Sequence, residues 1–77
     1  MHPMNVIIEI DAPQLLPHLR ARLEAGGCPA HAISSHACRV VHQDAVDVDE
    51  ALRELRFFVR AWALSHGDVA VSLTPDV

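Results

Sequence analysis

Cysteine and histidine are the residue types of this chain that are best suited to chemistry, and they gather in one stretch. The 77 residues include six histidines and two cysteines, and residues 28–42 hold Cys28, His31, His36, Cys38 and His42. Thiolate and imidazole groups are ligands of soft metal ions, so this stretch raises the hypothesis of a zinc- or copper-type site. A thiol and an imidazole are also the minimal pair for nucleophilic catalysis.

The length of one turn decides which of these side chains share a face. Two short strand-like segments on either side of Ser34, Ser35 and His36 predict a hairpin with its turn around residues 34–36. A three-residue turn puts Cys28, Cys38 and His42 on one face with Cys28 opposite His42, whereas a two-residue turn joins His31 with Cys38 and His42. Neither set has the C-x-x-C spacing of a zinc ribbon, and buried cysteines and scattered histidines are common without metal. We therefore expect no cofactor, and Cys28, Cys38 and His42 are the candidate ligands of a metal-binding alternative.

A catalytic thiol is harder to support than a metal site. Cys28 or Cys38 with His42 would form a thiol–base pair, but the sequence identifies no third residue to orient the base. Cys28 follows Gly26 and Gly27, which are expected to end a helix, and the negative end of a helix dipole disfavours a thiolate. The chain also has no glycine loop for phosphate and no calcium-binding pattern. These features favour a protein that is not an enzyme.

The elements that position these residues are predicted in the order strand, helix, strand, strand, helix, strand. Alternating or β-branched apolar residues predict strands over 5–10, 29–33, 37–42 and 69–74. Apolar residues at helical spacing predict one helix that ends at Gly26 and Gly27 and a second over about 48–65. This order predicts one α+β domain over residues 1–77 with the ferredoxin-like βαββαβ fold: a four-stranded antiparallel sheet in the order 4-1-3-2 with two helices on one face.

The helix starts carry their own signals. Pro17 is acceptable only in the first turn of a helix, so the first helix either begins near Leu16 or follows a separate turn over residues 13–16. Asp47 or Asp49 is expected to cap the second helix, because a carboxylate at a helix start accepts bonds from its unpaired amides.

Composition argues against several classes of function. The formal net charge is −4 and all six basic residues are arginines. An acidic chain without a basic patch is poorly suited to nucleic acid, and the predicted strands lack the aromatic residues with which RNA-recognition domains stack bases. No apolar run approaches the ~20 residues of a membrane span, and the first residues show no signal-peptide pattern, so we expect a cytoplasmic protein.

The second predicted helix has more apolar surface than one sheet face can cover. Phe58 and Trp62 are expected to pack in the core, while Phe57, Ala61 and Leu64 lie on another side of the helix. An exposed apolar patch of this kind usually marks association. We therefore predict a homodimer whose interface contains Phe57, Ala61 and Leu64.

One segment resembles a known family. An apolar strand, then residues 11–16 with Asp11 and Pro13, a helix with leucines and a glycine before the next strand resemble the opening of an ACT domain. Residues 39–41 and 49–55 are similar to the third strand and second helix of that family. Gln14 stands where the family usually has glycine.

The resemblance implies a regulatory module that binds a small metabolite between paired domains, with Asp11, Pro13 and Gln14 as the binding residues. Amides at a helix start can hold a carboxylate, so a carboxylate-bearing metabolite is the expected partner. In the alternative interpretation, Asp11 caps the helix and Pro13 shapes a turn. The function expected from the sequence is a non-catalytic, dimeric, ACT-like binding module; the alternatives are a soft-metal-binding domain and a structural protein-interaction module.

Overall fold

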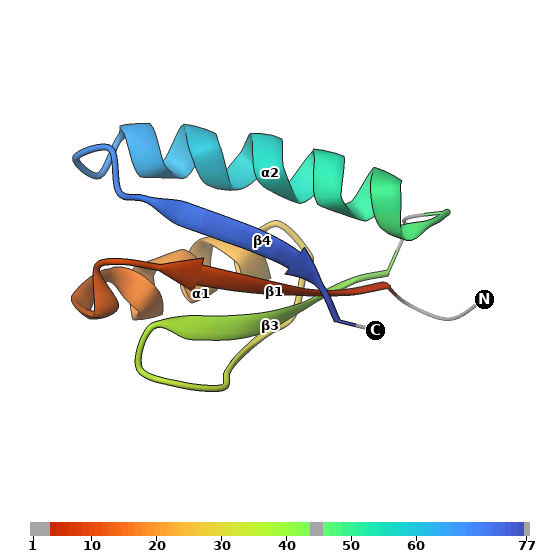
Figure 1. Ribbon diagram of the computed structural model, residues 1–77, viewed down its shortest axis with the longest axis horizontal. Helices are drawn as coiled ribbons and strands as arrows, with labels where there is room; N and C mark the ends of the chain where they lie inside the picture. Colours follow the sequence, from red (N-terminus) through yellow and green to blue (C-terminus); the bar gives the residue numbers. More distant parts are fainter. Residues whose placement is uncertain (1–3, 44–45, 77) are drawn as a thin grey trace.

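Four strands and two main helices make up the fold, which the computed structural model describes for residues 4–43 and 46–76. The strands are β1 (Met4–Ile10), β2 (Ala30–Ala32), β3 (Ala37–His42) and β4 (Val71–Pro75). The helices are α1 (Leu16–Ala25) and α2 (Val48–Leu64), and a short 3-10 turn, η1 (Pro13–Leu15), precedes α1. The sheet order is β2-β3-β1-β4 and each neighbouring pair is antiparallel. Figure 1 shows β1 between β3 and β4. The predicted α+β, ferredoxin-like fold and strand order 4-1-3-2 are confirmed.

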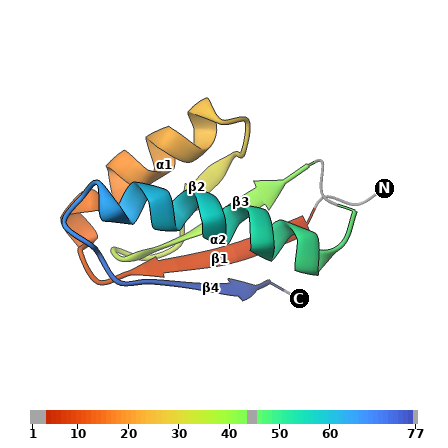
Figure 2. The ribbon, with the colours of Figure 1, turned by 90° about the horizontal axis from the view of Figure 1, so that it is seen from above.

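Both helices cover the same face of the sheet, side by side (Figure 2). Alternate residues of β1 point toward them, and Val6, Ile8 and Ile10 are buried there as the period of two predicts. The helices contribute a second set of buried residues: Leu16, Leu19, Leu23, Ala51, Leu55, Val59, Trp62 and Ala63. The opposite face combines polar residues with Ile7 and Val41, and on it Arg39 Nε donates to Asp76 Oδ2 at 2.6 Å.

The position of Pro17 left two alternatives for the start of the first helix, a start near Leu16 or a separate turn before it, and the structure has both features. Residues Pro13–Leu15 form the separate 3-10 turn, and α1 begins at Leu16 with Pro17 in its first turn. The helix ends in a Schellman motif, in which Cys28 N donates to Leu23 O at 2.9 Å and Gly27 N donates to Glu24 O at 3.0 Å. Gly27 has a φ of +89°, which a residue without Cβ adopts readily.

The second helix begins as predicted. Asp47 is its N-cap residue, and its Oδ1 accepts a hydrogen bond from Glu50 N at 2.8 Å. After α2, Gly67 and Asp68 both have positive φ, so the chain turns sharply before β4. For this reason β4 begins at Val71 rather than at the predicted residue 69. No helix within residues 4–43 and 46–76 is long and apolar enough to cross a membrane.

The hairpin between β2 and β3 has the three-residue turn. Ala32 lies opposite Cys38, and Ile33 N donates to Ala37 O at 3.0 Å, which leaves residues 34–36 as the turn. Of the two registers that the sequence allowed, this is the one with the three-residue turn. It places Cys28, Cys38 and His42 on the face that the helices cover.

Candidate functional site

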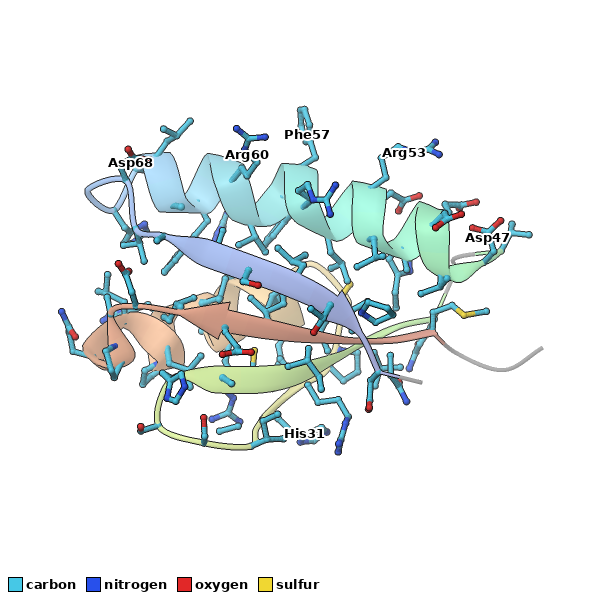
Figure 3. All side chains as sticks on the ribbon, viewed as in Figure 1. His31, Asp47, Arg53, Phe57, Arg60 and Asp68 are labelled. Atoms are coloured by element: carbon cyan, nitrogen blue, oxygen red, sulfur yellow. The ribbon has the colours of Figure 1, made fainter. Side chains whose placement is uncertain are left out.

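A groove lies between α1 and α2. It has a volume of about 750 Å³, and its surface is mainly apolar. Phe57, Phe58 and Trp62 of α2 supply aromatic surface, while Arg22 in the last turn of α1 and Arg53 of α2 supply positive charge. Figure 3 shows Arg53 and Phe57 pointing away from the sheet, on the outer side of α2.

Both arginines of this groove are open to an anionic partner. Arg22 lies over the Phe58 ring, with its Cζ 6.0 Å from the ring centroid. Neither Arg22 nor Arg53 forms an ion pair with another residue of the part that the structure describes. The acidic residue of the groove, Glu54, instead pairs with His42 at 2.7 Å. The groove therefore concentrates positive charge on a chain whose formal net charge is −4.

Trp62 and His66 form one end of the groove. Their rings are stacked, with centroids 4.4 Å apart and an interplanar angle of 24°. His66 Nδ1 lies 2.8 Å from Trp62 O, which fixes the imidazole against the helix end. Trp62 is buried, and its Nε1 finds no hydrogen-bond acceptor among the described residues. A buried donor without an acceptor costs about 1–3 kcal/mol.

The residues that the ACT-like resemblance implied lie elsewhere. Asp11, Pro13 and Gln14 are all exposed, and none of them lines the groove. Asp11 Oδ1 accepts a hydrogen bond from Ala70 N at 3.1 Å, and Asp11 N donates to Ala70 O at 3.2 Å. The alternative in which Asp11 caps the helix is wrong, because neither η1 nor α1 has a side-chain cap. Asp11 ties the end of β1 to the segment before β4, and ligand binding there stays a prediction.

The three predicted interface residues share one stripe on the outside of α2. Phe57 is 81% exposed and Leu64 is 71% exposed, and Ala61 lies between them on the same stripe. Trp62 is buried as expected, and Phe58 is half-buried against the core. The predicted division of the aromatic residues is therefore confirmed, while the partner that would cover the stripe stays a prediction.

The three candidate metal ligands share a face but differ in environment. Cys38 is fully buried, and this burial raises the pKa of its thiol from the ordinary 9.0 to about 11. At neutral pH Cys38 therefore keeps its proton and is a poor metal ligand. Within residues 4–43 and 46–76, no three His, Cys, Asp or Glu side chains are arranged to hold a metal ion. Cys28 and His42 line a smaller pocket with Glu54.

Sequence reasoning missed Arg22, Arg53 and Glu54. The wide apolar arc of α2 was the available signal for a groove, because such an arc needs more cover than the sheet gives. Nothing local to Arg22 indicates that it lies across from Phe58 of the other helix.

No protein-family model, curated protein or solved structure matches this chain.

Proposed function

We propose that this protein is a non-catalytic binding module for a small organic anion with a flat apolar body, and that the groove between α1 and α2 is its site. One observation carries the proposal: an aromatic recess of about 750 Å³ has two arginines without ion-pair partners among the described residues. Its volume lies within the range of roughly 300–1,000 Å³ that is usual for small-ligand sites. The expected ligand is a carboxylate, as the sequence also suggested.

The two halves of such a ligand would meet different surfaces. A flat ring can stack against Phe57 and Phe58, which offer large apolar area. Guanidinium groups bind carboxylates through paired, charge-assisted hydrogen bonds, and Arg22 and Arg53 come from the two helices that form the groove. A regulatory role and a cytoplasmic location belong to the same proposal.

Trp62 makes the proposal simple to test, because it is the single tryptophan of the chain and lines the groove. The fluorescent aromatic anion anilinonaphthalene sulfonate would be titrated into the protein while energy transfer from Trp62 is recorded. We expect saturable binding that aromatic carboxylates displace. Arg22→Gln and Arg53→Gln should each weaken binding about tenfold, since a hydrogen bond to a charged group contributes about 1.5–3 kcal/mol.

The matched control is Arg56→Gln. Arg56 is an exposed arginine of the same helix, but it lines a different depression beside β4 and not the groove. It should leave the affinity unchanged. Non-saturable fluorescence, or equal weakening by Arg53→Gln and Arg56→Gln, would show that the probe responds to overall charge and that the groove is not a binding site.

A second copy of the chain is the partner that we propose for the stripe of Phe57, Ala61 and Leu64. The exposure of Phe57 (81%) and Leu64 (71%) favours this, because large apolar side chains exposed along one stripe of a helix usually mark association. A copy seated on the stripe would also cover the open side of the groove. Sedimentation equilibrium should show a dimer that Phe57→Ser with Leu64→Ser converts to a monomer. A wild-type monomer at millimolar concentration would end the dimer proposal and leave the groove proposal intact.

A further inference from the structure

A second pocket lies where the end of α1 meets the end of β3 and the first half of α2. It has a volume of about 300 Å³, and Cys28, His42 and Glu54 are the titratable residues among its described lining residues. Phe58 and Glu54 also line the groove, so the two recesses share a wall. A thiol, an imidazole and a carboxylate around one recess are the residue types of an activated nucleophile and its base.

The pairing of β2 with β3 runs toward Cys28 and His42, which both line this pocket. β2 and β3 are antiparallel, and the bond from Val41 N to Pro29 O (2.9 Å) extends their pairing beyond the start of β2. Continued by one residue, the same register would set Cys28 opposite His42. Such a pair would be a non-hydrogen-bonded one, the kind in which facing side chains approach most closely.

Cys28 is held in this place but stays accessible. Its backbone N–H forms the last bond of the Schellman motif with Leu23 O, so the backbone at Cys28 is fixed by the end of α1. The residue is half-buried, in contrast to the fully buried Cys38. A partly exposed thiol is open to reagents that a core thiol never meets.

Glu54 orients the imidazole. His42 is only 8% exposed, and its Nε2 lies 2.7 Å from Glu54 Oε2. Because a carboxylate oxygen accepts, Nε2 donates and the basic nitrogen of the neutral ring is Nδ1. This pair supplies the third, orienting residue that the sequence could not identify.

We propose that Cys28 is a reactive thiol that exchanges with small disulfides, with His42 as its base and Glu54 as the positioning residue. His42 takes the thiol proton, and the Cys28 sulfur attacks one sulfur of the disulfide. The S–S bond breaks as the new bond to Cys28 forms, and the departing thiolate takes the proton from the imidazolium. The products are a mixed disulfide on Cys28 and one thiol, so electrons and protons balance without another oxidant. This step does not depend on a ligand in the groove.

The experiment follows the reaction of the folded protein with dithiobis(nitrobenzoate), which releases a coloured thiolate, and then with oxidised glutathione by mass spectrometry. We expect one fast equivalent of colour and one added glutathione. Cys28→Ser should abolish both, whereas Cys38→Ser should leave them. His42→Gln removes the base and should slow the fast phase at least about tenfold at neutral pH. Glu54→Gln should slow it by a similar factor, because it removes the carboxylate charge that stabilises the imidazolium. His31→Gln, at an exposed histidine on the other face of the sheet, is the control and should have no effect.

Two further readouts keep the test decisive. His42 is buried and its replacement can disturb folding, but the Glu54 side chain is 52% exposed, so Glu54→Gln should keep the native circular dichroism spectrum. At strongly alkaline pH the thiol ionises without a base, and the rates of wild type and Glu54→Gln should converge. A fast phase that survives Cys28→Ser, or a folded Glu54→Gln variant that reacts as fast as wild type at neutral pH, overturns the proposal.

Discussion

His42 Nε2 lies 2.7 Å from Glu54 Oε2, and this contact joins the end of β3 to the first half of α2. The His42 side chain is 10% exposed, while the Glu54 side chain is 52% exposed. Burial of a polar ring costs free energy unless the ring is hydrogen-bonded. Glu54 supplies the hydrogen-bond partner for the His42 ring, which β3 places in the core. The same contact also ties the first half of α2 to the end of β3.

We predict that the two partners of this contact differ in their effect on stability. His42→Ala removes a buried ring and leaves a cavity, so the free energy of unfolding should fall by about 2–3 kcal/mol. Glu54→Gln keeps an oxygen that can accept from His42 and should cost less than about 1 kcal/mol. Urea unfolding followed by Trp62 fluorescence measures both. Equal losses in the two variants would mean that burial of the ring is not the main contribution.

Substitution of Asp11 can distinguish its hydrogen bond with Ala70 from a role in ligand binding. Asp11→Ala loses the bond from Ala70 N and should lower the free energy of unfolding by about 1 kcal/mol, whereas Asp11→Asn keeps an accepting oxygen and should lose less. Neither variant should change binding of anilinonaphthalene sulfonate, because Asp11 does not line the groove. If Asp11→Ala abolished binding while the fold persisted, the turn that the ACT-like resemblance implied would be the site instead.

The order of elements could be read from the sequence because each signal is local. The alternation of Val6, Ile8 and Ile10 marks a strand with one buried face, and Gly26 with Gly27 marks a helix end. The hairpin register could not be read, because residues 34–36 contain no Asn-Gly or Asp-Gly pair that would fix the turn type.

The candidate site depends on pairs that no local pattern encodes. Arg22 and Phe58 come from different helices, and they meet only because α1 and α2 lie side by side on the sheet. His42 and Glu54 meet only once the rotation of α2 on the sheet is fixed. Such pairs follow from tertiary packing, so the sequence supplied the residue types but not the partners.

The N-cap of α2 should contribute measurably to stability. Asp47→Ala removes the acceptor for Glu50 N, which lies 2.8 Å away, and should lower the free energy of unfolding by about 1 kcal/mol. Asp47→Ser restores a capping oxygen and should recover most of the loss. Asp49→Ala is the matched control on the same helix, because the cap bond belongs to Asp47. A larger loss in Asp49→Ala than in Asp47→Ala would contradict this assignment.

Alkaline pH should destabilise the protein through Cys38. The chain has no lysine and no tyrosine, so cysteines are the side chains that titrate between pH 9 and 11. Burial raises the pKa of the Cys38 thiol from 9.0 to about 11, against a smaller opposing effect of the Arg20 charge. Above pH 9 the unfolded chain loses this proton while the folded chain keeps it, so ionisation stabilises the unfolded state.

The free energy of unfolding should therefore be unaffected by Cys38 below pH 9 and fall by about 2–3 kcal/mol as the pH rises to 11. Urea unfolding in the presence of a reductant, at a series of pH values, measures how the free energy of unfolding changes with pH. Cys38→Ala should be less stable at every pH, because it leaves a small cavity, but its stability should stay nearly level across this range. If Cys38→Ala lost as much stability between pH 9 and 11 as wild type does, another group would be responsible and the raised pKa of Cys38 would be wrong.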